Sequence, residues 1–173
     1  LTMIDLSFNA SKTRSRWGGF SLKWYTALFS NTDIMQALYN TLIIALLAAI
    51  ISTILGTMAA IGIGSMKKKI QSVFSAITNI PMLNGEIVMG ISLMLLFILV
   101  RMNLGFSTIL MSHITFDIPY VILSVMPKIK QYPKSTYEAA LDLGASPLQS
   151  FFKVVFPDIM PGVLSGFLLA FTM

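Results

Sequence analysis

The sequence predicts an all-α fold, a polytopic membrane helical bundle with one helical elbow outside the lipid. The composition is 55% hydrophobic and only 11% charged, whereas a soluble domain is roughly a quarter charged. Three long apolar segments precede a polar, turn-rich stretch at residues 131–162, and a fourth begins after it. Because this polar stretch lies between membrane spans, we expect it to meet a partner outside the lipid.

The first segment, residues 1–36, is mixed and polar, and we expect an extracytoplasmic loop. It lacks the basic start, short apolar core and small-residue cleavage site of a signal peptide. Trp17, Trp24 and Tyr25 are suited to the membrane interface, where aromatic side chains anchor a protein. Residues 20–31 could form a short interfacial helix.

Residues 37–64 predict the first membrane-spanning helix. No charge occurs between Asp33 and Lys67, a stretch longer than the ~20 apolar residues that a bilayer requires. Small residues recur at every fourth position and share one helical face, which lets a neighbouring backbone approach closely. They are Ala48, Ser52, Gly56, Ala60 and Gly64. We expect a packing face, although small residues are common in such helices and the partner is not identified.

Residues 70–100 predict a second membrane-spanning helix, kinked near Pro81. One charged residue, Glu86, lies near its middle, after Pro81 and Gly85, which both weaken a helix. A broken helix at membrane depth is tolerated only against protein or a water-filled cavity. We therefore expect Glu86 to face the translocation path; the alternative is a structural carboxylate bonded to a neighbouring helix.

Residues 104–126 predict a third span, which Pro119 should kink. His113 and Asp117 are four residues apart and share one face. They could form a mutually satisfied pair that stabilises the bundle. Alternatively, Asp117 could hold a cationic substrate, with Tyr120 supplying an aromatic face. A lone histidine is no metal site, so we expect no bound metal.

Residues 127–160 predict two short helices joined by one glycine. Ser135 and Glu138 have the spacing of a capping box, which starts the first helix near Thr136. Gly144 lies where a left-handed residue would end that helix.

The second helix of this elbow begins at a repeated signal. Ser146 and Gln149 again have capping-box spacing, with Pro147 at the favourable first helical position. An apolar stripe follows, made of Leu148, Phe151, Phe152, Val155 and Phe156. We expect Pro157 to end the helix.

The elbow resembles the EAA loop of ABC importer permeases, whose pattern is E-A-A-x3-G-x9-I-x-L-P. The matching residues are Glu138, Ala139, Ala140, Gly144, Val154, Phe156 and Pro157, without a gap. Val154 replaces the isoleucine and Phe156 the leucine. The rest of the chain is similar to polyamine (spermidine/putrescine) importer permeases, at residues 86–93 and 112–116.

This resemblance implies a multi-pass permease of the bacterial inner membrane. The implied partners are a dimeric ABC ATPase subunit, a second permease subunit and an extracytoplasmic solute-binding protein. ATP would be used by the ATPase partner, with no cofactor bound by this chain. Glu138, Ala139, Ala140, Gly144 and Pro157 are then expected to couple the permease to the ATPase.

Lysine distribution predicts which side of the membrane holds the elbow. Alternating spans place residues 65–69 and 127–160 on one side, with seven Lys or Arg, and residues 1–36 and 101–103 on the other, with five. The positive-inside rule places the elbow in the cytoplasm. Residues 161–173 would start a further span, and because members of the resembling family usually have six spans, we expect a fragment.

Other functions are less well supported by the residues. There is no G-x-x-x-x-G-K-[ST] motif and no nucleophile elbow, so we do not expect an enzyme. The scattered basic residues argue against nucleic-acid binding. Permeases for iron, sugar, phosphate or sulfate share the EAA pattern. An ion-gradient-driven carrier, with Glu86, His113 and Asp117 as a proton relay, and a membrane scaffold remain the alternatives.

Overall fold

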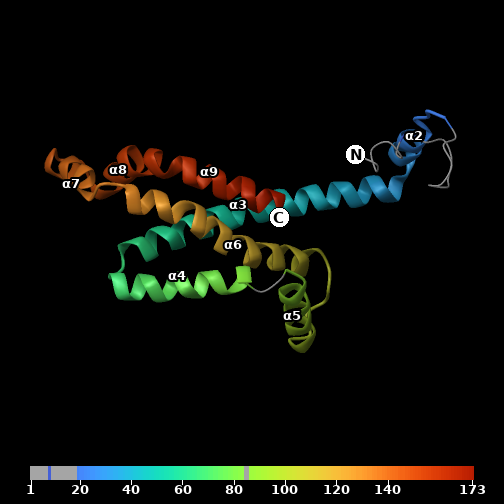
Figure 1. Cartoon of the computed structure of the whole chain (residues 1–173), viewed down its shortest axis with the longest axis horizontal. Helices are drawn as coiled ribbons and strands as arrows, with labels where there is room; N and C mark the ends of the chain where they lie inside the picture. Colours follow the sequence, from blue (N-terminus) through green and yellow to red (C-terminus); the bar gives the residue numbers. More distant parts are fainter. Residues whose placement is uncertain (1–7, 9–18, 84–85) are drawn as a thin grey trace. The chain divides into compact units, whose positions relative to one another are not determined.

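The computed structural model describes residues 8, 19–83 and 86–173, and these are almost entirely helical. Its helices are α2 (Lys23–Ser30), α3 (Thr32–Ser65), α4 (Lys68–Leu83), α5 (Glu86–Leu99), α6 (Phe106–Gln131), α7 (Lys134–Asp142), α8 (Pro147–Ser150), the π-helix η1 (Phe151–Val155) and α9 (Phe156–Thr172) (Figure 1). The chain divides into two compact units, residues 1–43 and 44–173, which are described separately.

The first unit contains α2 and the beginning of α3. The expected short helix within residues 20–31 is present as α2. Asn31 caps the following helix, because its side-chain oxygen accepts bonds from the backbone N–H groups of Asp33 (3.1 Å) and Ile34 (3.3 Å). α3 therefore begins at Thr32, five residues before the predicted start at residue 37.

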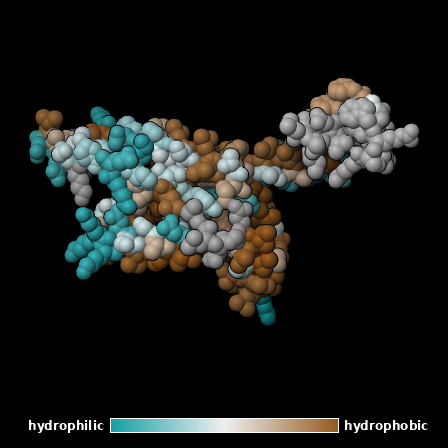
Figure 2. Space-filling model, viewed as in Figure 1, coloured by the Kyte–Doolittle hydropathy of each residue, from teal (hydrophilic) through white to brown (hydrophobic). Residues whose placement is uncertain are grey.

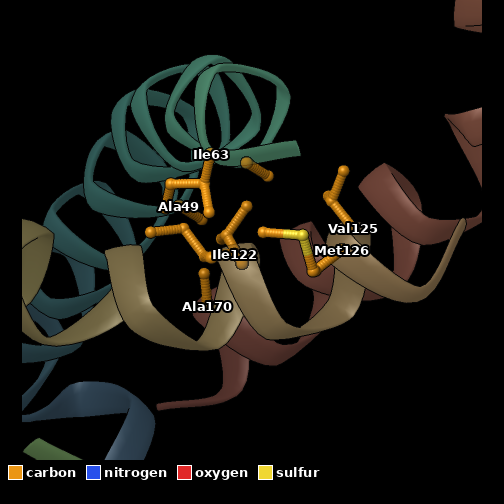
Figure 3. Close-up of a cluster of buried hydrophobic side chains, with 8 residues drawn as sticks. Ala49, Ile63, Ile122, Val125, Met126 and Ala170 are labelled. Carbon is orange, nitrogen blue, oxygen red and sulfur yellow. The ribbon is translucent and has the colours of Figure 1, made fainter. Parts of the chain in front are cut away.

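In the second unit α6 packs between α3 and α9. The buried apolar side chains of the core come from all three helices and are Ala49, Ala60, Ile63, Val121, Ile122, Val125, Met126 and Ala170 (Figure 3). α3, α6 and the continuous stretch Pro147–Thr172 are each long and apolar enough to cross a membrane. Hydrophobic residues cover much of the visible surface of this unit (Figure 2), as expected for a surface that faces lipid.

The predicted face of small residues on α3 is confirmed, and its partner is α6. Ala48, Ser52, Gly56 and Ala60 are buried. A Cβ added at Gly56 would lie 2.7 Å from Val121, and one at Gly64 would lie 2.7 Å from Ile129. From the pair Gly56–Val121 to the pair Gly64–Ile129, the residue number rises by eight on each helix. α3 and α6 therefore run parallel.

α9 approaches α6 through glycines of its own, which we did not predict from the sequence. A Cβ added at Gly162 would lie 3.0 Å from the Ser124 carbonyl oxygen, and one at Gly166 would lie 3.2 Å from Val121 Cα. As α9 advances from 162 to 166, its contacts on α6 move backward, so these helices are antiparallel. The spacing of four shared by Gly162, Gly166 and Ala170 was the available signal.

The predicted second span at residues 70–100 is described as two helices, α4 and α5, and residues 84–85 lie outside the described residues. α4 continues through Pro81 to Leu83, so the proline itself does not end that helix. Neither helix reaches the length of a full span, since 16 and 14 residues extend only ~24 and ~21 Å.

The predicted limits of the third span and the elbow also need correction. α6 extends through Pro119 and Pro127 to Gln131, beyond the predicted end at residue 126. Prolines are tolerated in packed membrane helices because neighbouring groups satisfy the freed backbone. The polar connection is therefore shorter than residues 127–160, and residues 161–173 continue a helix rather than begin one.

Pro157 does not end the second elbow helix. The π-helix η1 lies directly before it, and the Phe156 N–H bonds the Phe151 carbonyl five residues earlier. In a regular α-helix the proline ring would clash with the carbonyl of Lys153. The wider π turn removes that clash, so the helix continues from Pro147 to Thr172.

Candidate functional site

The elbow turns at Gly144, as the sequence predicted. Gly144 has φ +86°, and its N–H bonds the Leu141 carbonyl at 2.9 Å. The Ala145 N–H bonds the Ala140 carbonyl at 3.1 Å. This pair of bonds is the Schellman motif, which satisfies the last carbonyls of α7 and reverses the chain.

The capping box predicted for the second helix is confirmed. The Ser146 side chain accepts a bond from the Gln149 N–H at 3.3 Å, and the Ser146 N–H donates to the Gln149 side chain at 3.2 Å. Pro147 occupies the first turn. These reciprocal bonds fix the start of α8 three residues after Gly144, so the bend is tightly defined.

The capping box predicted for the first helix is wrong. α7 begins at Lys134 after Pro133, whose φ of −73° and ψ of 118° end the extended segment, and no side chain caps it. The Thr136 N–H already bonds the Pro133 carbonyl at 3.1 Å, so Ser135 lies inside the first turn. Glu138 is exposed and has no part in capping.

The other predicted coupling residues lie along the same elbow. Ala139 is exposed and Ala140 half-buried on α7, while Gly144 forms the bend. Pro157 is exposed, more than one turn into the long helical stretch. Their coupling role stays a prediction.

Two leucines at the elbow are strongly exposed, which we did not predict from the sequence. Leu143 is 89% exposed and Leu148 is 71% exposed, and they flank the Gly144 bend. Figure 2 shows hydrophilic residues gathered at the end of the second unit where α7 and α8 lie. The signal in the sequence was the position of both leucines near the helix ends that Gly144 and Ser146 mark. The end of a short helix has few neighbours that could bury an apolar side chain.

Three phenylalanines connect the elbow to the spans. The Phe151 and Phe152 rings meet edge to face at 5.2 Å, and Phe156 lies 6.2 Å from Phe152. With Thr53, Thr57 and other residues of α3 they line a cavity of about 370 Å³. The three elbow aromatics therefore lie beside α3, one of this chain's own membrane-length helices.

Tyr132 lies at the junction of α6 and α7. Its hydroxyl is buried and has no hydrogen-bond partner among the described residues. Burial, followed by the negative charge of Asp158, raises the pKa of Tyr132 above its usual value. The phenol is therefore protonated at neutral pH and able to donate a hydrogen bond.

Of the three predicted path residues, the structure describes the side chains of Asp117 and Tyr120. The side chain of Glu86 lies outside the described residues, and Tyr120 is half-buried. Asp117 is buried between helices with 1% exposure. The expected His113–Asp117 pair is wrong: His113 Nδ1 lies 2.9 Å from the Ile109 carbonyl oxygen, and neither Asp117 oxygen has a described hydrogen-bond partner.

A second cavity, of about 350 Å³, lies between α5 and α6. Phe97, Met94 and Ile109 supply apolar lining. The Thr108 and Ser112 hydroxyls also line it but bond backbone carbonyls of their own segment at 2.9 Å. Within the described part of the chain, no group of three or more His, Cys, Asp or Glu side chains could hold a metal ion.

The lysines 67–69 follow the end of α3 that lies beside the end of α6, from which the elbow continues. Gly64 contacts Ile129, so the end of α3 lies beside the end of α6. The lysines follow α3 directly, and α7 follows α6. The predicted grouping of these two basic segments on one side agrees with this arrangement.

The sequence of this chain is similar to those of known transport proteins. A family model described as binding-protein-dependent transport system inner membrane component matches residues 52–173. The spermidine/putrescine transport system permease protein PotC of Escherichia coli K12 is 36% identical over 173 residues, covering 100% of this chain and 66% of that protein. The PotC protein of Haemophilus influenzae is 36% identical over 172 residues, covering 99% and 67%. The putrescine transport system permease protein PotI of Escherichia coli K12 is 36% identical over 180 residues, covering 100% and 64%.

Proposed function

Since the chain belongs to the family of binding-protein-dependent transport system inner membrane components, we propose that it is a membrane-spanning subunit of an ATP-driven importer. The elbow formed by α7 and α8 docks in a groove of a separate ATPase subunit. The chain spans 66% of the length of PotC, so the proposal concerns the larger protein of which these helices form part.

The observation that carries this proposal is the pair of exposed leucines at the bend. Leu143 and Leu148 are 89% and 71% exposed. Burying a leucine side chain contributes about 1.5–3 kcal/mol, so a partner groove that covers both gains substantial affinity. Glu138, exposed on α7, supplies a polar contact at the rim, in the usual manner of a helix in a groove.

The elbow is mechanically connected to the spans. Its second helix is continuous with the 26-residue stretch Pro147–Thr172, and this stretch contacts α6 at backbone distance through Gly162 and Gly166. A displacement of the elbow by the ATPase therefore moves α9 along or around α6. Nucleotide-driven closure of the ATPase dimer can in this way alternate the access of the translocation path.

We assign spermidine and putrescine as the transported class. The support is the identity of 36% to permeases that carry these names. A solute-binding protein outside the membrane delivers the substrate, and a second permease subunit completes the path. Several sides of the helices described here, including exposed Ile87 and Leu99 of α5, remain available to lipid or to that subunit.

The test compares Leu143→Asp with Leu143→Met in the full-length transporter, assembled with its ATPase and reconstituted into proteoliposomes. The aspartate variant should still insert but bind the ATPase at least about tenfold more weakly, because about 1.4 kcal/mol of lost burial corresponds to a factor of ten. The methionine variant keeps the apolar contact and should behave as wild type. Equal ATPase binding by both variants contradicts docking through the bend.

The energy source is tested in the same vesicles. ATP-dependent putrescine uptake that persists with a protonophore supports the importer. Uptake that requires an ion gradient and ignores ATP would show a secondary carrier instead. Uptake of iron, sugar or phosphate in preference to putrescine would retain the importer and reject the polyamine assignment.

A further inference from the structure

Among the described residues, Asp117 is the buried residue whose side chain can carry a charge. It is 1% exposed, and neither carboxyl oxygen has a hydrogen-bond partner among the described residues. A buried polar group without a partner is unfavourable, and an isolated buried carboxylate is far more so. Such a group in a membrane-spanning helix requires a physical explanation.

The contacts of α6 place Asp117 in the most closely packed part of the bundle. Val121, one turn further along, contacts both Gly56 of α3 and Gly166 of α9. The parallel pairing with α3 then puts Asp117 level with Ser52, and the antiparallel pairing with α9 puts it level with Ala170. Both neighbours are buried and small, so no room remains for a hydrated ion.

No described group donates a hydrogen bond to Asp117, and His113, one turn earlier on α6, is the nearby group that acts on it electrostatically. The Ser52 hydroxyl donates to the Ala49 carbonyl at 3.2 Å. The stretch 44–65 of α3 has no titratable residue, and α9 has only Asp158, at its far end. On α6 itself His113 bonds the Ile109 carbonyl, and Tyr120 is the nearest other titratable residue.

We propose that Asp117 is a cation-binding carboxyl group that holds a proton in this packed arrangement and an ammonium group when the helices separate. The inference rests on the proposed function, since the ammonium is that of the transported polyamine. When α3 and α9 move away from α6, the acid O–H bond breaks and the proton passes to water. The resulting carboxylate pairs with one substrate ammonium, so one positive charge replaces another.

This exchange explains why an acid is compatible with such tight packing. A neutral carboxylic acid is much less costly to bury than a carboxylate, whereas an exposed carboxylate attracts a cation strongly through a charge-assisted hydrogen bond. Closing the helices again requires either the proton to return or the cation to leave. Release of substrate is thereby linked to closure of the three-helix contact.

The first experiment examines the carboxyl group itself in the full-length, reconstituted transporter. Infrared spectra of the wild type should contain the carbonyl stretch of a protonated carboxylic acid that is absent from Asp117→Asn. The band should decrease when putrescine-loaded binding protein and ATP are added. A wild-type spectrum without this band, or a band that does not respond to substrate and ATP, overturns the proposal.

The second experiment measures ATP-driven putrescine uptake between pH 5.5 and 8. In the wild type, protons compete with the ammonium, so KM should rise as the pH falls. Asp117→Asn should raise KM about tenfold, the effect of one lost charged hydrogen bond. It should also abolish the pH dependence of KM. Thr115→Ala, an exposed position on the same helix, should retain the wild-type profile.

The outcomes separate this proposal from the proposed function. An Asp117→Asn transporter with wild-type KM and pH profile overturns the cation site, while its ATP-driven uptake leaves the importer intact. A wild-type complex that shows no ATP-driven uptake rejects the importer. Where Asp117→Asn does not assemble, the smaller Asp117→Ser provides the same comparison.

Discussion

Gly56 of α3 lies against Val121 of α6 so closely that an added Cβ would be 2.7 Å from the Val121 Cβ and 3.2 Å from the Ile118 carbonyl oxygen. Neither neighbour is the mobile end of a long side chain. We therefore expect Gly56→Ala to destabilise the bundle by about 1–3 kcal/mol, the usual effect of overpacking. Thermal unfolding of the purified transporter in detergent measures this loss.

Gly62 provides the matched control on the same helix. A Cβ added there would meet no atom within 4 Å, so Gly62→Ala should retain the wild-type melting temperature or exceed it slightly, because alanine favours a helix by about 1 kcal/mol. An equal loss of stability in both variants would show that the two glycines act through helix flexibility. In that case the close contact with α6 would not be the cause.

The left-handed Gly144 predicts a defect in coupling rather than in folding. Any other residue at φ +86° costs about 1–2 kcal/mol, and the bend is outside the packed core. This strain is confined to the elbow, so Gly144→Ala should leave membrane insertion and the melting temperature of the packed spans nearly unchanged. Substrate-stimulated ATP hydrolysis by the assembled complex should fall severalfold.

Gly105 serves as the comparison for Gly144, since both are exposed glycines outside the helices. Gly105 has φ 179°, which every residue type adopts, and a Cβ there would meet nothing within 4 Å. Gly105→Ala should keep wild-type ATP hydrolysis. Undiminished stimulation in Gly144→Ala would mean that the bend does not transmit force.

Local chemistry explains which parts of this fold could be predicted from the sequence. Gly144 and Ser146 were correctly assigned because a left-handed turn and a capping box depend on a few adjacent residues. The long uncharged run in α3 was recognised as a span for a similarly simple reason, the thickness of the bilayer. The periodic small residues predicted a packing face, but the choice of α6 as partner depends on contacts between distant segments.

The errors arose where one local rule competed with another. Pro157 was expected to end a helix, but the π turn before it relieves the clash. Ser135 was expected to cap α7, but Pro133 starts the helix earlier. The burial of Asp117 and the exposure of Leu143 could not be predicted, since each depends on where neighbouring elements lie in space.

The two candidate capping serines give a direct comparison of sequence and structure. Ser146 accepts the Gln149 N–H, so Ser146→Ala should lower stability by about 1 kcal/mol, as is typical for a lost N-cap. Ser135 lies inside the first turn of α7 and caps nothing there, so Ser135→Ala should be neutral. Proteolysis rates of the elbow in the folded transporter report both effects, and faster cleavage of the Ser135 variant alone would reverse the assignment.

The parallel arrangement of α3 and α6 predicts the sidedness of three exposed positions. α6 has 26 residues and so extends ~39 Å, more than the ~30 Å apolar core of a bilayer. Asn103 before it and Asp142 after it must then lie on opposite sides of the membrane. Lys68 must lie on the side of Asp142, because Gly64 at the end of α3 contacts Ile129 at the end of α6.

Single cysteines can test this sidedness, because the chain has none of its own. Lys68→Cys and Asp142→Cys should react with a membrane-impermeant maleimide only in inside-out vesicles, since the positive-inside rule places their side in the cytoplasm. Asn103→Cys should react only in right-side-out vesicles. Labelling of Lys68→Cys and Asp142→Cys from opposite sides would contradict the parallel helices. If instead each of the three cysteines reacts only in the other type of vesicle, the orientation in the membrane is reversed. The elbow would then lie on the side away from any cytoplasmic ATPase.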